Sequence, residues 1–142
     1  MKIKTKNFGE IEIEGNKVIN FQEGILGFPD ETRYAILEFK KDDPFKWLQA
    51  VDNPKVVFVI IDPCLIFPDY KSVVTAENIG LPDSNIQDAD IFTIVTIPEN
   101  PVDITVNLQG PIIFDFKKHI AKQFVLYNKL YTTKHRIFPA VK

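Results

Sequence analysis

The side chains that could act as a nucleophile are few in this sequence. A nucleophilic serine or cysteine needs a neighbouring base and a strained turn that exposes it. Neither Ser72 nor Ser84 lies in a G-x-S-x-G motif. The single cysteine, Cys64, is followed by three apolar residues, a setting that raises the pKa of a thiol and leaves it unreactive. The sequence therefore favours a small buried side chain at Cys64 over a nucleophile.

Histidines and carboxylates form no recognisable metal or acid–base motif. His119 and His135 lie on lysine-rich stretches, without the short ligand spacings of zinc sites, so we expect both to be exposed. Turn formation explains most of the aspartates near predicted strand ends, which are Asp62, Asp69, Asp83, Asp88 and Asp90. We expect no metal ion and no cofactor. A small hydrolase with a carboxylate pair stays an alternative, and a deep pocket with convergent acids would favour it.

Glycine-rich phosphate loops are also missing from the pattern. Gly24-Ile25-Leu26-Gly27 is followed by Phe28-Pro29 and not by a helix with a lysine, so it predicts a tight turn. The formal net charge of −2 and the pI of about 5.7 argue against direct binding of nucleic acid, which draws on clustered Lys and Arg. The chemistry that remains is binding chemistry.

The elements that must position these residues are predicted to be short strands. Most of the ten prolines fall between apolar segments, as in a small all-β barrel or sandwich. We expect one β-barrel-like domain over 1–142, of antiparallel strands with one or two short helical turns, whose basic end frays from about residue 132. The predicted strands are 10–14, 18–21, 34–39, 56–61, 91–97, 102–108, 112–116 and 123–127.

Three details of this prediction are open to test. Gly15-Asn16 predicts a turn that joins 10–14 and 18–21 into a hairpin. The unbroken apolar run at 56–61 predicts a central strand covered on both faces. Residues 45–50 fit either a helix capped by Asp43-Pro44 or a strand, and the aromatic residues favour the strand. A short helical turn or two is expected within 76–88.

The longest apolar run has six residues, against roughly 20 for a membrane-spanning helix. The N-terminus lacks the apolar stretch of a signal peptide. With one cysteine and no such stretch, we expect a soluble protein of the cytoplasm that does not contact the membrane.

Two groups of residues suggest a binding surface. Glu10, Glu12 and Glu14 would share one strand face, either as a solvated edge or as an acidic strip that repels nucleic acid from a partner. Trp47 and Tyr70 suit either a binding hot spot or the core. Gln49 shares the predicted face of Phe45 and Trp47, and its amide needs a hydrogen-bonding partner inside or outside the protein.

Several segments, in order, resemble the flagellar assembly factor FliW family. The resemblance extends to about Tyr131 and is carried by Gly24–Phe28, Pro44–Pro54, Phe58–Pro63, Pro68–Tyr70, Asn107–Ile112 and Gln123–Leu126. Three small-residue positions depart from the family pattern, with Gly110 for the usual Ala, Ala121 for Gly and Ala50 for Ser.

This resemblance implies a non-enzymatic regulator with two protein partners. One is flagellin, bound in the cytoplasm before export. The other is the carbon storage regulator, a CsrA-type RNA-binding protein that represses translation of flagellin mRNA and is antagonised by the free factor. A chaperone that binds flagellin only is the alternative. The candidate partner-contact residues are Glu10, Glu12, Glu14, Phe45, Trp47, Gln49, Asp62, Asp69, Tyr70 and Asn107.

Overall fold

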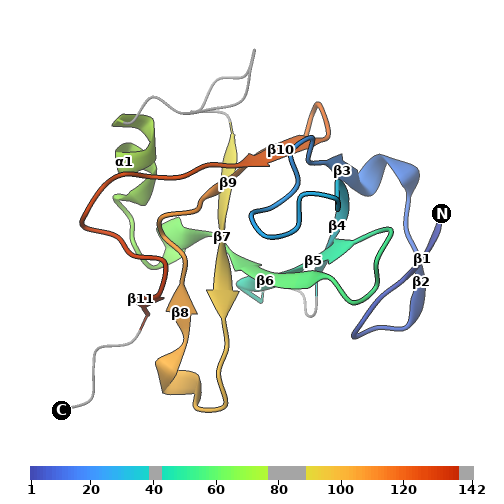
Figure 1. Cartoon of the computed structure of the whole chain (residues 1–142), viewed down its shortest axis with the longest axis horizontal. Helices are drawn as coiled ribbons and strands as arrows, with labels where there is room; N and C mark the ends of the chain where they lie inside the picture. Colours follow the sequence, from blue (N-terminus) through green and yellow to red (C-terminus); the bar gives the residue numbers. More distant parts are fainter. Residues whose placement is uncertain (39–42, 77–88, 138–142) are drawn as a thin grey trace.

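The computed structural model describes residues 1–38, 43–76 and 89–137 (Figure 1). Short strands dominate these residues, as the spacing of prolines predicts. The strands are β1 (Lys2–Lys4), β2 (Glu10–Glu12), β3 (Val18–Asn20), β4 (Arg33–Glu38), β5 (Phe45–Ala50), β6 (Val57–Ile61), β7 (Asp90–Thr96), β8 (Thr105–Val106), β9 (Ile112–Asp115), β10 (Ile120–Gln123) and β11 (His135–Arg136). The helical elements described are α1 (Tyr70–Ala76) and the 3-10 turns η1 (Gly15–Lys17), η2 (Pro63–Leu65) and η4 (Pro101–Asp103).

Seven strands close into a barrel in the order β7, β6, β5, β4, β3, β10 and β9, with β9 pairing back to β7. The prediction of a small β-barrel is confirmed, but the prediction of antiparallel strands throughout is wrong, since β3 and β10 run parallel. An odd number of strands cannot alternate in direction all the way round a closed barrel, so one pair must be parallel. The parallel pair joins the start of the barrel to its end (Figure 1).

The alternation of side chains along each strand separates the inside of the barrel from its outside. The interior holds a buried apolar cluster that includes Ile19, Tyr34, Leu48, Ile60 and Phe114. A second cluster packs the outer face of β6 and β7 against α1, β8 and the C-terminal segment, and a third packs the outer face of β4 against the β1–β2 hairpin. The 56–61 run contributes to the first two clusters, which confirms a central strand covered on both faces.

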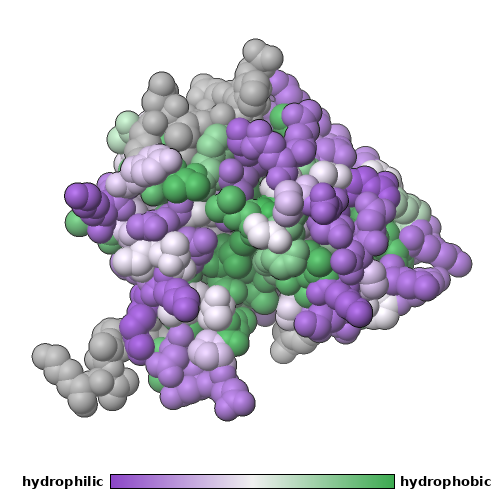
Figure 2. Space-filling view, viewed as in Figure 1, coloured by the Kyte–Doolittle hydropathy of each residue, from purple (hydrophilic) through white to green (hydrophobic). Residues whose placement is uncertain are grey.

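Apolar side chains also reach the surface. Figure 2 shows them along a hollow that crosses the middle of one face of the molecule, with hydrophilic residues on both sides of it. The large hydrophobic residues with the highest exposed fractions in the described part of the chain, between 64% and 83%, are Leu26, Leu65, Tyr127 and Leu130.

The predicted hairpin at Gly15-Asn16 is wrong. Residues 15–17 form η1, and β2 pairs with β1 while β3 pairs with β4 and β10. Pairing with β1 places Lys2 opposite Glu12 and Lys4 opposite Glu10, and it buries Ile3. Cross-strand pairs of opposite charge stabilise this alternative.

The predicted strand at 102–108 is mostly wrong as well, because β8 has only Thr105 and Val106. Asn100 caps η4, with Pro101 at its first position, and this turn replaces the start of the strand. The alternation of the sequence places Val102, Ile104, Val106 and Leu108 on one face, and this holds only from Ile104 onward, since Val102 is 41% exposed while the other three are buried.

The remaining predicted elements are shifted or outside the described residues. Residues 45–50 are a strand, as favoured. The strand predicted at 123–127 lies at Ile120–Gln123, while α1 was not predicted and the helical turns expected within 76–88 fall mostly outside the described residues. Near the C-terminus, β11 pairs with β8 and Ile137 packs against the second cluster, and the fraying expected from about residue 132 stays a prediction.

Candidate partner-binding surfaces

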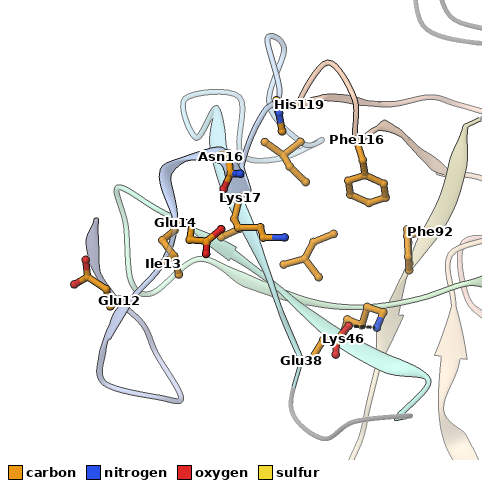
Figure 3. Close-up of a pocket in the computed structure, with 13 residues that line it drawn as sticks. Glu12, Ile13, Glu14, Asn16, Lys17, Glu38, Lys46, Phe92, Phe116 and His119 are labelled. Atoms are coloured by element: carbon orange, nitrogen blue, oxygen red, sulfur yellow. Dashed lines mark hydrogen bonds and ion pairs between the residues drawn. The ribbon is translucent and has the colours of Figure 1, made fainter.

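One end of the barrel opens into a pocket of about 720 Å³, here called the mouth pocket (Figure 3). Its apolar lining includes Ile19, Ile36 and Phe92 from inside the barrel, Phe116 beyond the end of β9, and Ile13 and Ala35 from the third cluster. The polar lining is Glu12, Glu14, Asn16, Lys17, Glu38, Lys46 and His119. A concave site with an apolar floor and a polar rim is the usual form of a binding site at a barrel mouth.

Ion pairs engage two of the three carboxylates around this mouth. Lys46 Nζ lies 2.9 Å from Glu38 Oε1, across the β4–β5 pair (Figure 3). The N-terminal amino group lies 2.8 Å from Glu12 Oε1. Glu38 and Glu12 are therefore each held by a cation at the rim of the mouth pocket.

The acidic strip expected from Glu10, Glu12 and Glu14 extends beyond one strand. Glu10 and Glu12 lie on β2, and Glu14 follows as the residue before η1. All three are exposed, and the cross-strand partners Lys2 and Lys4 place positive charge directly opposite Glu12 and Glu10. The strip is therefore one side of a mixed-charge hairpin, and Glu12 and Glu14 connect it to the mouth pocket.

The outer face of β5 carries Trp47 and Gln49, and the loop between β1 and β2 covers it. The rings of Phe8 and Trp47 meet edge to face with centroids 6.1 Å apart, and Trp47 stays half-buried. Gln49 is only 1% exposed. Its Nε2 donates to the carbonyl oxygens of Ala50, Pro54 and Val56 at 3.1–3.3 Å. Its Oε1 accepts from Lys6 N–H at 3.3 Å, so the amide finds its partners inside the protein.

The remaining candidates lie around α1 and β8. Tyr70 is fully buried, and its hydroxyl donates to Leu108 O at 2.7 Å. Asp62 Oδ1 accepts from Cys64 N–H at 2.9 Å and caps η2, as expected of a turn aspartate. Asp69 is exposed next to α1, Asn107 Oδ1 accepts from Gln109 N–H at 3.1 Å, and Phe45 is half-buried against the second cluster.

Sequence reasoning placed these candidates by motif, and the structure brings only some of them together. Glu12 and Glu14 meet at the mouth pocket, whereas Gln49 and Tyr70 lie in the interior. The mouth residues Phe92, Phe116 and His119 were not among the candidates. The alternation of side chains along β4 and β5 could have indicated this pocket. Glu38 and Lys46 fall on inward-facing positions, and charged side chains at such positions fit an open end of the barrel.

The reactive residue types have ordinary environments. Cys64 is half-buried, and burial raises the pKa of its thiol, as the sequence predicts. His119 and His135, expected to be exposed, are both half-buried, and His135 meets the rings of Phe67 and Tyr131 edge to face. Within the described ranges, no group of three His, Cys, Asp or Glu side chains is placed to hold a metal ion. No helix that the structure describes is long and apolar enough to span a bilayer.

The fold defines a class, a closed seven-stranded mixed β-barrel, and its candidate binding surfaces lie on the exterior and at one mouth. A family model described as "FliW protein" matches residues 2–137. The chain belongs to the FliW family, a family of non-enzymatic assembly factors.

Relatives and a solved structure agree over nearly the whole chain. A protein of Heliobacterium modesticaldum named "Flagellar assembly factor FliW" is 39% identical, covering 99% of this chain and 92% of its own length. One of the same name from Geotalea uraniireducens is 44% identical, covering 97% and 85%. A solved structure titled "Crystal structure of the flagellar assembly factor FliW" superposes with a TM-score of 0.83 at 36% identity, covering 99% of both chains.

Proposed function

We propose that this chain is a flagellar assembly factor that binds flagellin in the cytoplasm. When it is free of flagellin, it binds the carbon storage regulator and relieves repression of flagellin mRNA. The observation that carries the proposal is the match over 99% of both chains to a flagellar assembly factor of solved structure. A match of that extent leaves no room for an extra catalytic domain within this chain.

The scheme requires two binding equilibria that exclude each other. A ligand shifts a population only through its differential affinity, so flagellin and the regulator must compete for one pool of this protein. Such a switch is sharp when both dissociation constants lie below the cellular concentration. Nanomolar binding, about −12 kcal/mol, meets that requirement.

Calorimetry with the purified protein tests the proposal. Titration with flagellin and with the regulator, each alone, should give two binding isotherms. Titration of the flagellin complex with the regulator should give a much weaker apparent affinity. Binding of flagellin alone would select a flagellin-only export chaperone, and binding of neither protein would overturn the proposal.

Antagonism of RNA binding is proposed to use the acidic strip. Carboxylates held beside the regulator's RNA-binding surface would repel phosphates, because like charges brought together at an interface cost several kcal/mol. Glu14 and Glu12, at the rim of the mouth pocket, are the members of the strip that also border a concave site.

A neutralised strip should weaken this antagonism. The triple variant Glu10→Gln, Glu12→Gln and Glu14→Gln avoids the repulsion that charge reversal would create against Lys2 and Lys4. We expect it to bind the regulator yet to displace RNA about tenfold less effectively in a competition titration. The control neutralises three exposed acids elsewhere, Asp30, Asp90 and Glu99, and should leave displacement unchanged. If the strip variant displaces RNA from the regulator as effectively as the native chain does, the acidic strip is not the cause of the antagonism.

A further inference from the structure

Beyond β10 the chain continues as an extended edge, and no strand among the described residues pairs with the outer side of Val125. Phe124 N–H donates to Pro111 O and Leu126 N–H donates to Gln109 O, both at 2.8 Å. Because peptide groups alternate in direction along an extended chain, those of Val125 point away from the barrel. No hydrogen bond within the described residues reaches the backbone N–H or C=O of Val125.

The barrel leaves this edge open because its closing seam is short. β3 pairs with β10 only through Asn20 and Ile120, supported by a 2.8 Å bond from Asn20 N–H to His119 O. The chain then turns away through the Gly24–Gly27 loop. It returns to β10 through the ion pair of Glu23 with Lys122, at 3.4 Å, and through a bond of 2.9 Å from Leu26 N–H to Gln123 Oε1. Beyond Gln123 no described strand continues the sheet on this side.

A small pocket lies at the point where the seam opens. Its volume is about 250 Å³, and it is lined by Glu23, Gly24, Ile25, Leu26, Gly27, Pro29 and Gln123. Gln123 spans the seam, since its Nε2 also donates to Gly110 O at 3.1 Å. Leu26 is 68% exposed and Val125 45% exposed, so the pocket and the edge together present apolar side chains. We call Gln123–Tyr127 and this pocket the seam edge.

The charged residues that flank Gln123–Tyr127 in sequence are cations, whereas the pocket is lined by one acid, Glu23. All 19 acidic residues of the chain lie at or before Asp115, and every charged residue after it is a Lys or an Arg. Lys117, Lys118 and Lys129 are exposed on either side of the edge in sequence. Lys122 lies 3.4 Å from Glu23, which neutralises one cation. An uncharged, apolar edge is a template for strand pairing, and the surrounding cations select an acidic partner.

We propose that an extended, acidic segment of a partner protein adds to the seam edge as a further strand. Its backbone bonds to Val125, an apolar side chain enters the seam pocket, and its carboxylates lie near Lys122 and Lys129. This is the mode of recognition in which main-chain bonds supply affinity and pockets supply specificity. The inference rests on the proposed function only in that it takes the chain to be a protein-binding module.

A synthetic peptide of seven residues that alternates Glu and Val, blocked at both ends, is the probe. Its binding to the ¹⁵N-labelled full chain is followed by amide chemical shifts and by hydrogen exchange. The expected result is a shift at residues 123–127 and slower exchange of the Val125 amide. A twin peptide N-methylated on the amides that face the edge should bind at least about tenfold more weakly, because it cannot complete the main-chain bonds. A twin with Lys for Glu should not bind.

Two pairs of variants locate the effect. Val125→Pro removes the outward N–H without removing a bond of the folded chain, and Val125→Thr keeps both the N–H and the branched side chain. The proline variant should lose about tenfold in affinity and the threonine variant little. Lys129→Glu should weaken binding, whereas Lys55→Glu, also exposed, should not. If the proline variant fails to fold, the N-methylated peptide still decides.

Several outcomes would overturn the inference. They are shifts that map to the mouth pocket, equal binding of the N-methylated peptide, or self-association of the protein through the edge in sedimentation, which would assign the edge to a second copy. Flagellin and the regulator are titrated separately into Val125→Pro. If the acidic peptide does not bind but flagellin and the regulator bind normally, strand addition at the seam edge is refuted and the proposed function is not affected.

Discussion

Two glycines with the same backbone conformation play different parts. Gly9 and Gly24 have φ near +65°, a region that costs L-residues roughly 1–2 kcal/mol. A Cβ on Gly9 would meet nothing within 4 Å, whereas one on Gly24 would lie 2.5 Å from Phe28 O and 2.7 Å from Pro29 Cα. The tight turn at Gly24–Gly27 therefore depends on the absence of a side chain as well as on the dihedral angle.

Gly24→Ala should destabilise the protein far more than Gly9→Ala. Both variants carry the dihedral cost, but only the first forces backbone atoms apart. We expect Gly9→Ala to lower the free energy of unfolding by about 1 kcal/mol and Gly24→Ala by about 3 kcal/mol or more. Urea denaturation of both measures the difference. Equal losses would mean that the turn relaxes around the added methyl group.

At the scale of elements, the β1–β2 hairpin acts as a cover for the barrel. It packs Ile3 and Ile11 on the outer face of β4 and places Phe8 on Trp47 of β5. The sequence predicted β2 from its alternation but paired it with the wrong strand. A turn at Gly15-Asn16 is a local signal, whereas the pairing of Lys2 with Glu12 is a contact between separate segments that periodicity does not encode.

Phe8→Ala should uncover Trp47, the only tryptophan of the chain. Loss of the edge-to-face contact exposes the indole, so its fluorescence emission should shift to longer wavelength. The free energy of unfolding should fall by about 1–3 kcal/mol. Phe116→Ala is the control, because Phe116 is 40% exposed and stacks on Phe114 at the mouth. An unchanged emission in Phe8→Ala would show that the hairpin covers Trp47 without Phe8.

At the scale of the whole molecule, the sequence predicted a β-barrel but not the parallel β3–β10 pair that closes it. Short apolar segments between prolines predicted the barrel, and the uninterrupted apolar run at 56–61 predicted its central strand. The odd number of barrel strands requires one parallel pair, and the chain order places it between β3 and β10. Pro111 accepts a bond from Phe124 N–H but has no N–H to donate in return, and the regular pairing of β10 with β9 ends at Gln123.

Among the candidate site residues, the sequence predicts exposure where it depends on local alternation and misses burial where it depends on distant contacts. Exposed glutamates were correctly placed on the surface, because alternation with Ile11 and Ile13 is a local property. Gln49 and Tyr70 gave no such signal. Their burial depends on acceptors supplied by Pro54, Val56 and Leu108, and those carbonyl groups carry no sequence signature.

The interior of the barrel should make stability depend on alkaline pH. Tyr34 is fully buried, and no described residue bonds to its hydroxyl. Burial, and to a lesser extent the charge of Glu31, raises its pKa to about 12. Between about pH 10 and 12 the unfolded chain loses this proton while the folded chain retains it. The free energy of unfolding should therefore be complete below pH 10 and fall as the pH rises to 12.

Tyr34→Phe isolates this group. At pH 7 it should leave stability unchanged or raise it by about 1 kcal/mol, because it removes a buried hydroxyl without a partner. Above pH 10 it should flatten the decline seen with the native chain. The measurement is denaturant unfolding across the pH series. A loss of more than about 2 kcal/mol at pH 7 would reveal a hydrogen bond, for example to an ordered water.

The parallel seam also fixes the order in which a growing chain can finish folding. Asn20 and His119, whose bond closes the barrel, lie 99 residues apart in sequence. During synthesis the strands from β3 to β9 can pair with their neighbours as they leave the ribosome, but they form an open sheet. The ring is completed only after Ile120 has emerged, when most of the polypeptide has already been translated.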